Sequence, residues 1–278
     1  MGSDDASPAR EAASAAALEL VEPGMAIGLG SGRAVWRLVE RIGERWPDGG
    51  GVRAAVASER TRDRASEAGI EVIELDGSVE LDLALDGADE IDPDLRLVKG
   101  GGGALLREKI VVAAARRFVV IAETSKRVER LGEGFRLPVE IARFAWADTH
   151  RRLARVLPDP ELRMADDEPY VTDEGHYILD CPLGDGVDLE ALDDDLRHVP
   201  GVLDHGLFLG MAERALLGTP EGDVEVMENE LTGAGRSRSA EASYSPSALT
   251  AALPARRRSP PGRGSRRTSR AKFSAAVR

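Results

Sequence analysis

Carboxylates and a lysine that could together catalyse proton transfer lie within one short stretch of the chain. Asp86 and Asp89 stand three residues apart, and Lys99 directly precedes four consecutive glycines. Glu108 follows five residues after the last of these glycines. Carboxylates move protons, a lysine stabilises an oxyanion or a phosphate, and glycines let backbone N–H groups approach a ligand closely. This combination predicts an active site for a small, polar, negatively charged substrate.

The predicted elements around this stretch would bring these groups to one edge of a sheet. Asp86 and Asp89 follow a strand predicted over 81–85, where an open α/β sheet carries its ligand-binding groups. A helix predicted over 104–116 begins at the end of the glycine loop and directs its positive end toward it.

Glu108 on this helix has two interpretations. It lies off the apolar stripe formed by Leu106, Ile110 and Ala113, which we expect to face the core. By itself, such a glutamate is typical of a solvated helix surface. Because it belongs to the same strand–loop–helix unit as Lys99 and the glycine loop, a role in proton transfer also stays open.

A second glycine-rich loop occurs at 28–32, between a predicted strand and a predicted helix. Backbone N–H groups at such a junction can hold a phosphate, although a tight turn would also explain the glycines. The loop is not the dinucleotide-binding fingerprint, because that spacing requires a glycine where this chain has Arg33. Ser58, Thr61 and the arginine between them, Arg60, follow the next strand and could face the same edge, or Ser58 could simply cap a helix.

The order of the predicted elements indicates the fold class. Short apolar runs alternate with amphipathic stretches up to about residue 126, which predicts a parallel, doubly wound sheet. The order then changes to β-α-β-β-α, including a hairpin of 170–172 and 176–181, which is typical of a small antiparallel α+β domain. We therefore expect an α/β protein with a Rossmann-like main domain and a smaller α+β, ferredoxin-like insertion. The expected boundaries are 1–130 completed by 204–230, 131–203 for the insertion, and 231–278 for a tail.

The individual elements are predicted from apolar periodicity. Helices are expected over 9–21, 33–46, 59–68, 104–116, 147–156 and 189–197. Strands are expected over 25–29, 52–56, 70–75, 81–85, 118–122, 137–141, 161–164, 170–172, 176–181, 206–211 and 215–217.

The formal net charge of −12 combines an acidic body with a basic tail. Residues 1–231 hold 26 basic and 48 acidic side chains, whereas residues 232–278 hold 11 and 1. Such a body would repel itself in dilute buffer but suits high salt, where charges are screened within about 3 Å at 1 M. We expect a halophilic protein, with a merely acidic one as the alternative. The acidic body also argues against nucleic acid as its main partner.

The tail 231–278 is rich in arginine and serine and has almost no periodic apolar signal, which predicts disorder. Three explanations stay open: a basic tail that binds nucleic acid or acidic surfaces, an inert extension, or an out-of-frame or read-through end of an arginine-rich coding sequence. We expect truncation after Leu231 to leave activity intact.

The rest of the composition indicates a cytoplasmic protein. No run of about 18 apolar residues is long enough to span a membrane, and the acidic start lacks a signal-peptide pattern. Cys181 is the single cysteine, which excludes a disulfide framework, and we expect it to be buried. The four histidines lack metal-ligand spacing, so structural roles are expected for them.

Over about residues 10–228 the chain resembles ribose-5-phosphate isomerase of type A. The family patterns Asp-Gly-Ala-Asp-Glu, Lys-Gly-Gly-Gly-Ala and Arg-Glu-Lys-Ile correspond to 86–90, 99–104 and 107–110. Further similar segments, in order along the chain, are 28–34, 122–126, 137–140, 171–180, 200–202, 206–208 and 218–220.

The resemblance implies interconversion of D-ribose 5-phosphate and D-ribulose 5-phosphate through a cis-enediolate, in the non-oxidative pentose phosphate pathway. It implies that no metal or other cofactor takes part. Glu108 would be the base that moves the proton between C1 and C2, and Lys99 would stabilise the enediolate together with loop amides. Asp86 and Asp89 would bind sugar hydroxyls and open the ring. The implied substrate-binding residues are Gly30, Ser31, Gly32, Arg33, Asp86, Gly87, Ala88, Asp89, Lys99, Gly100, Gly101, Gly102 and Lys126.

The resemblance also implies a homodimer or homotetramer, for which the insertion is a plausible contact surface. The sequence departs from the family in the phosphate loop, where Gly-Thr-Gly-Ser-Thr is replaced by residues 30–34, Gly-Ser-Gly-Arg-Ala. Arg33 could replace the two lost hydroxyls with a bidentate phosphate contact, or it could point to solvent. Two rival functions are a non-catalytic sugar-phosphate sensor and an isomerase or deaminase of an amino sugar phosphate. Glu108 with Lys99 counts against the sensor.

Overall fold

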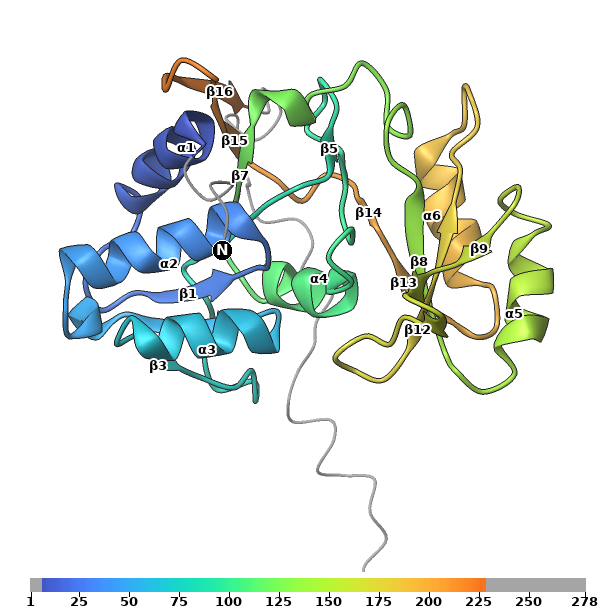
Figure 1. Cartoon of the computed structure of the whole chain (residues 1–278), viewed down its shortest axis with the longest axis horizontal. Coiled ribbons are helices and arrows are strands. Elements are labelled where there is room, and N and C mark those ends of the chain that lie inside the picture. Colours follow the sequence, from blue (N-terminus) through green and yellow to red (C-terminus); the bar gives the residue numbers. More distant parts are fainter. Residues whose placement is uncertain (1–6, 229–278) are drawn as a thin grey trace, which may run out of the picture. The chain divides into compact units, whose positions relative to one another are not determined.

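The structure is a computed structural model that describes residues 7–228 (Figure 1). The predicted tail 231–278 lies outside these residues. The main sheet has seven strands in the spatial order β16-β15-β7-β4-β1-β2-β3, and all neighbouring pairs are parallel except β15 and β16. The predicted α/β class with a mainly parallel sheet is confirmed. The strands are β1 (Ala26–Leu29), β2 (Arg53–Val56), β3 (Glu71–Val72), β4 (Leu83–Asp86), β7 (Phe118–Glu123), β15 (Arg214–Gly218) and β16 (Val224–Glu228).

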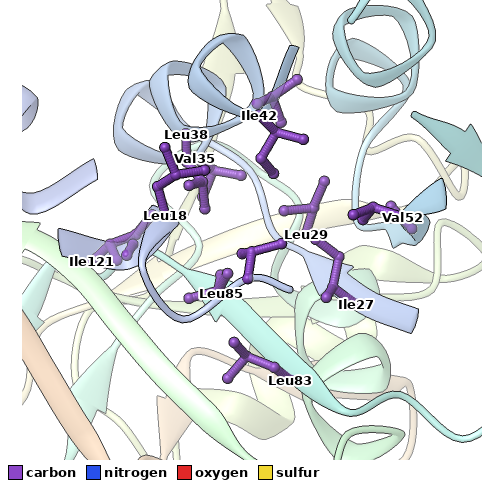
Figure 2. Close-up of a cluster of buried hydrophobic side chains, with 14 of the residues drawn as sticks. Leu18, Ile27, Leu29, Val35, Leu38, Ile42, Val52, Leu83, Leu85 and Ile121 are labelled. Carbon is purple, nitrogen blue, oxygen red and sulfur yellow. The ribbon is translucent and has the colours of Figure 1, made fainter. Parts of the chain in front are cut away.

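Helices cover both faces of this sheet. One face is covered by α1 (Pro8–Leu18), α2 (Arg33–Arg45) and α3 (Glu59–Glu67), whose apolar residues share a core with the sheet. Figure 2 shows part of this core, in which side chains of α2 pack over those of β1 and β4. The other face is covered by α4 (Leu105–Ala113). At Gly28, a Cβ would lie 2.5 Å from Val111 of α4, so this glycine permits close helix packing.

The buried face of α4 differs from the predicted one. Leu105, Glu108 and Lys109 point inward, whereas Ile110 is 52% exposed. The prediction that Leu106, Ile110 and Ala113 face the core is therefore wrong. The helix buries charged side chains instead, because each of them has a charged partner nearby.

The insertion contains a four-stranded antiparallel sheet in the order β13-β8-β12-β9. Its β-α-β-β-α-β chain order and this strand arrangement confirm the predicted ferredoxin-like α+β unit. Cys181 is fully buried in its core, as predicted. The elements are β8 (Leu137–Ile141), α5 (Trp146–Leu153), β9 (Glu161–Leu162), β12 (Tyr177–Cys181), α6 (Leu189–Arg197) and β13 (Val202–His205).

The predicted hairpin in this unit is wrong in part. The turn at 173–175 is present, but residues 170–172 are not a strand, and β12 pairs with β8 and β9 instead. The short strands β10 (Met164–Ala165) and β11 (Glu168–Pro169) pair with each other. The segment 170–176 is therefore a loop. The proposed domain boundaries stay a prediction.

A small three-stranded sheet links the two larger ones. It consists of β5 (Glu90–Ile91), β6 (Leu97–Val98) and β14 (Leu207–Phe208), paired antiparallel. Strand β6 ends directly before Lys99, so this sheet fixes the start of the glycine loop. Short 3-10 turns occur at Gly49–Gly51 and Thr124–Lys126. Within the described residues, no helix is long and apolar enough to cross a membrane.

Candidate active site

The predicted site residues meet at the carboxyl edge of the main sheet. Ser31 follows β1, Asp86 ends β4, and Lys126 follows β7. Strands β1 and β4 are neighbours, although the chain builds β2 and β3 on the far side of β1 before it returns to β4. This reversal of strand order opens a crevice at the strand ends, which is where open α/β sheets bind ligands.

Lys99 lies at the centre of this crevice and is almost fully buried. Its Nζ donates a 2.6 Å hydrogen bond to the carbonyl of Gly87 and lies 2.9 Å from Oδ2 of Asp86 and 3.1 Å from Oε2 of Glu108. The two carboxylates raise the pKa of Lys99 against the opposing effect of burial. The ammonium therefore stays charged between two carboxylates.

Asp86 is buried beside a second negative charge. Burial, and then the charge of Glu108, raise the pKa of Asp86 to about 7, while Lys99 opposes this shift. Its Oδ1 accepts hydrogen bonds from the backbone N–H groups of Ser31 and Gly87. At Gly30, a Cβ would lie 1.7 Å from Cγ of Asp86, so only glycine fits at this position.

Glu108 is held by groups from two other segments. Ser31 Oγ donates a 2.6 Å hydrogen bond to Oε1 of Glu108, while Oε2 lies next to Lys99. Oε2 of Glu108 and Oδ2 of Asp86 lie within ion-pair distance of Lys99, but neither has a hydrogen bond of good geometry within residues 7–228. Glu108 lines the cavity described below, so its Oε2 can accept a proton from a ligand, whereas Asp86 does not line that cavity.

Asp89 and the glycine loop form the adjoining wall. Oδ2 of Asp89 accepts a 2.8 Å hydrogen bond from the N–H of Gly101, which ties the β4 loop to the glycine loop. Gly103 has a φ of +82°, and a Cβ there would lie 2.2 Å from the hydroxyl oxygen of Tyr170. The glycines let the loop fit between Asp89 and Tyr170.

These groups line a single cavity of about 490 Å³. Its walls include every predicted site residue except Gly30 and Asp86, which lie directly behind them. Arg10, Tyr170 and Asp173 also line the cavity, although no sequence pattern had indicated them as site residues. Arg60, which was expected to be able to face this edge of the sheet, lines it too. Ser58, for which two roles were left open, caps α3 by accepting from the N–H of Thr61, and it lines the cavity as well.

The lining of the cavity is rich in cations. Arg10, Arg33, Arg60 and Lys126 all belong to it. Arg10 is buried and pairs with Glu123 at 2.8 Å. The lining also includes the N-terminus of α2 at Gly32, where backbone N–H groups favour an anion. These groups suit an anionic group of a ligand.

A loop of the insertion closes one side of the cavity. The Tyr170 hydroxyl donates to the carbonyl of Gly102 at 3.3 Å, and Asp173 accepts from the N–H of Glu59 at 3.1 Å. Arg107 bridges Glu59 at 2.8 Å and Glu174 at 2.6 Å. These contacts fasten the loop to α3 and α4. No sequence motif had indicated Tyr170 or Asp173 as site residues. They lie in the insertion, which folds as a separate α+β unit, so only the tertiary structure brings them to the cavity.

The geometry suits proton transfer on a small anionic polyol. The carboxylates of Asp89 and Glu108, the Lys99 ammonium and further cations line the same cavity. Within residues 7–228, no group of three or more His, Cys, Asp or Glu side chains has an arrangement that could hold a metal ion. The positive charge between the carboxylates comes from Lys99.

Comparison with known proteins agrees with this chemistry. The sequence profile of "Ribose 5-phosphate isomerase A (phosphoriboisomerase A)" matches residues 53–222. The chain is 51% identical over 220 residues to ribose-5-phosphate isomerase A of Roseiflexus castenholzii, covering 78% of this chain and 94% of that protein. It is 45% identical over 224 residues to the enzyme of the same name from Sinorhizobium fredii, covering 78% of this chain and 96% of that protein.

Solved structures give the same result. Ribose 5-phosphate isomerase A from Methanocaldococcus jannaschii has a TM-score of 0.74 and 32% identity, covering 79% of this chain and 97% of its own. Ribose 5-phosphate isomerase A from Neisseria gonorrhoeae has a TM-score of 0.73 and 34% identity, and the match covers 82% of this chain and 99% of that protein. A D-ribose-5-phosphate isomerase solved in complex with phospho-erythronic acid has a TM-score of 0.74 and 31% identity, and the match covers 79% of this chain and 97% of that protein.

Proposed function

The chain belongs to the ribose 5-phosphate isomerase A family, and from this premise we propose how its residues carry out the reaction. The protein is an aldose–ketose isomerase that interconverts D-ribose 5-phosphate and D-ribulose 5-phosphate. This reaction belongs to the pentose phosphate pathway. The assignment of individual residues to its steps is our proposal.

Glu108 is the base that moves the proton between C1 and C2. One carboxylate can take the proton from one carbon and return it to the other, because both carbons of a cis-enediolate are in reach of the same group. The observation that carries this role is the position of Glu108. Ser31 donates a hydrogen bond to one of its oxygens, and the other lies 3.1 Å from the Lys99 ammonium and accepts no hydrogen bond of good geometry from residues 7–228.

Lys99 stabilises the negative charge that develops on the enediolate oxygens. A fixed ammonium in a buried site stabilises such a charge more strongly than one in water. Its hydrogen bond to Gly87 holds the ammonium in place before the substrate arrives.

Asp86 and Asp89 handle the hydroxyl groups and the opening of the sugar ring. A pKa of about 7 lets Asp86 either give or accept a proton near neutral pH. Asp89 lines the cavity itself and accepts from the N–H of Gly101. Gly87, Ala88 and the glycines at 100–102 then shape the wall along the sugar.

The phosphate binds at the cationic part of the lining, among residues 30–33 and Lys126. Gly32 contributes a backbone N–H at the start of α2, and Arg33 and Lys126 supply positive charge. Ser31 lines the cavity, but its hydroxyl donates to Glu108 and its N–H donates to Asp86, so its part in phosphate binding is to hold the loop in position.

The test of this function is the conversion of ribose 5-phosphate to ribulose 5-phosphate by the purified chain. Phospho-erythronic acid should inhibit competitively, because its carboxylate resembles the charged, planar enediolate end of the intermediate. Binding of ribose 5-phosphate without turnover would contradict the proposal and favour a sensor. Preferential turnover of an amino sugar phosphate would contradict it in favour of that substrate class.

We further propose a cytoplasmic, halophilic homodimer or homotetramer. The cytoplasmic location is supported by the pathway, whose intermediates are phosphorylated sugars. The halophilic character is supported by the excess of 48 acidic over 26 basic side chains in residues 1–231. The oligomer is an expectation from family membership. The acidic body is not expected to bind nucleic acid.

A further inference from the structure

Helix α3 carries three arginines, and two of them pair with carboxylates. Arg62 lies 3.0 Å from Glu74, and Arg64 lies 2.9 Å from Glu40. Arg60 makes no ion pair with any residue that the structure describes, and it is the one of the three that lines the active-site cavity. Acidic side chains outnumber basic ones by 48 to 26 in residues 1–231, so the lack of a described carboxylate partner for Arg60 does not come from a shortage of acidic residues.

The Arg60 guanidinium is held by stacking rather than by a carboxylate. Its Cζ lies 3.9 Å from the centroid of the Trp36 ring. A guanidinium that stacks on an aromatic ring keeps its in-plane N–H groups available for a bidentate contact with an anion. The exposed edge of Arg60 is therefore suited to phosphate.

Trp36 is itself fixed to the loop at the start of α2. Its Nε1 donates to Oγ1 of Thr61 at 3.1 Å, and that hydroxyl donates to the carbonyl of Gly30 at 2.9 Å. The backbone N–H of Trp36 bonds to the carbonyl of Gly32. These contacts hold the Trp36 ring, and the guanidinium stacked on it, in a fixed position relative to residues 30–32, where the phosphate is proposed to bind.

We propose that Arg60, stacked on Trp36, is a further phosphate-binding residue of this enzyme and determines its preference for a phosphorylated sugar. It compensates for the hydroxyls that positions 33 and 34 lack, with a contact from α3 instead of from the α2 loop. This inference rests on the proposed function of the cavity. Arg60 does not contact the reacting carbons, so it affects binding of the substrate and not the proton transfer.

The test compares Arg60→Ala with a matched control on the same helix. Arg64→Ala removes an arginine whose Cζ lies 5.0 Å from the same ring but which pairs with Glu40 and does not line the cavity. The readouts are kcat, the KM for ribose 5-phosphate and the inhibition constant of inorganic phosphate. Arg60→Ala should raise KM and the phosphate inhibition constant about tenfold and leave kcat within about twofold.

Arg64→Ala should stay within about twofold of the wild type in all three quantities. Arg60→Lys keeps the charge without the planar fork and should recover only part of the loss. The inference is overturned if Arg60→Ala leaves both KM and the phosphate inhibition constant unchanged. It is also overturned if Arg64→Ala raises them equally, because the effect would then come from Trp36 or α3.

Failure of the proposed function is recognised separately. A wild-type chain that does not convert ribose 5-phosphate would refute the function, whatever the variants do. In that case, calorimetric titration of the wild type, Arg60→Ala and Arg64→Ala with inorganic phosphate still tests Arg60. Weaker phosphate binding by Arg60→Ala alone would support the contact, and equal binding by all three chains would refute it.

Discussion

The hydroxyl of Ser31 donates a 2.6 Å hydrogen bond to Oε1 of Glu108, joining the loop after β1 to the catalytic helix α4. The two residues are 77 positions apart in the chain. Because this bond fixes one carboxylate oxygen, the other is directed toward Lys99, which lies 3.1 Å from it. The loop proposed for phosphate binding therefore also orients the proposed base.

Glu108→Gln should remove the base and preserve the shape of the site. The amide cannot accept a proton from carbon, so we expect kcat to fall by about 10²- to 10⁴-fold. Binding of ribose 5-phosphate should stay within about threefold of the wild type, because the amide oxygen of glutamine can still accept the hydrogen bond from Ser31 that holds the phosphate loop in place. Steady-state kinetics and calorimetric titration measure the two quantities. Glu67→Gln, an exposed position on α3, is the control, and unchanged turnover in Glu108→Gln would remove Glu108 from the mechanism.

The titration of Asp86 should make stability depend on pH. Burial and the charge of Glu108 raise the pKa of Asp86 to about 7 in the folded protein, compared with about 3.9 when unfolded. The folded state thus binds the proton more tightly. The contribution of this bound proton to the free energy of unfolding is complete below about pH 4 and is lost as the pH rises through about 7.

Asp86→Asn, which cannot ionise, should lack this loss. The free energy of unfolding of the wild type relative to Asp86→Asn should therefore decrease from about pH 5 to about pH 8. Urea unfolding at several pH values measures it, with Asp63→Asn on the exposed side of α3 as the control. A constant difference between wild type and Asp86→Asn would show that Asp86 does not titrate in this range.

The chemistry of the site was predictable from the sequence, but the way that α4 presents it was not. Asp86, Lys99 and Glu108 were recognisable because their residue types and spacing are unusual. Apolar periodicity then suggested that Ile110 faces the core and Glu108 faces solvent. In the structure Glu108 is buried and Ile110 is exposed. Glu108 and Lys109 can face inward because they form ion pairs with Lys99 and Asp204, and apolar periodicity takes no account of ion pairs.

The residues that complete the cavity could not be predicted for a different reason. Arg10 lies on the first helix, and Tyr170 and Asp173 lie in the insertion, so only the tertiary fold brings them to the site. Arg60 was expected to be able to face this edge because it follows a strand, but no motif indicated what it would bind. Its role depends on Trp36, 24 positions earlier, and on the absence of the carboxylate partners that its neighbours on α3 have.

Activity should not depend on a bound metal ion. The Lys99 ammonium already lies between Asp86 and Glu108, at 2.9 and 3.1 Å, where a cation would otherwise be needed to stabilise an oxyanion. Dialysis against excess EDTA should leave kcat unchanged, measured against a sample that was dialysed without chelator. A loss of activity that added metal restores would contradict this prediction.

Thermal stability should increase with salt. The acidic side chains of residues 1–231 repel one another, and raising KCl from about 0.1 M to about 1 M shortens the screening length from about 10 Å to about 3 Å. The same salt weakens ion pairs such as Arg107 with Glu174, but exposed pairs each contribute only about 0–1 kcal/mol. We expect Tm, followed by circular dichroism, to rise with KCl. A fall in Tm would show that the ion pairs dominate and would contradict the halophilic proposal.

Gly30→Ala should inactivate the enzyme by displacing Asp86. A Cβ at position 30 would lie 1.7 Å from Cγ of Asp86, a buried carboxylate that cannot move away without breaking its contact with Lys99. We expect kcat to fall by at least about 100-fold, since small displacements of catalytic groups have effects of this size. Gly184→Ala is the control, because its Cβ would lie 3.5 Å from the nearest heavy atom, at Val187, an ordinary contact distance. If Gly30→Ala kept wild-type kcat, the close approach of this loop to Asp86 would not be required for catalysis.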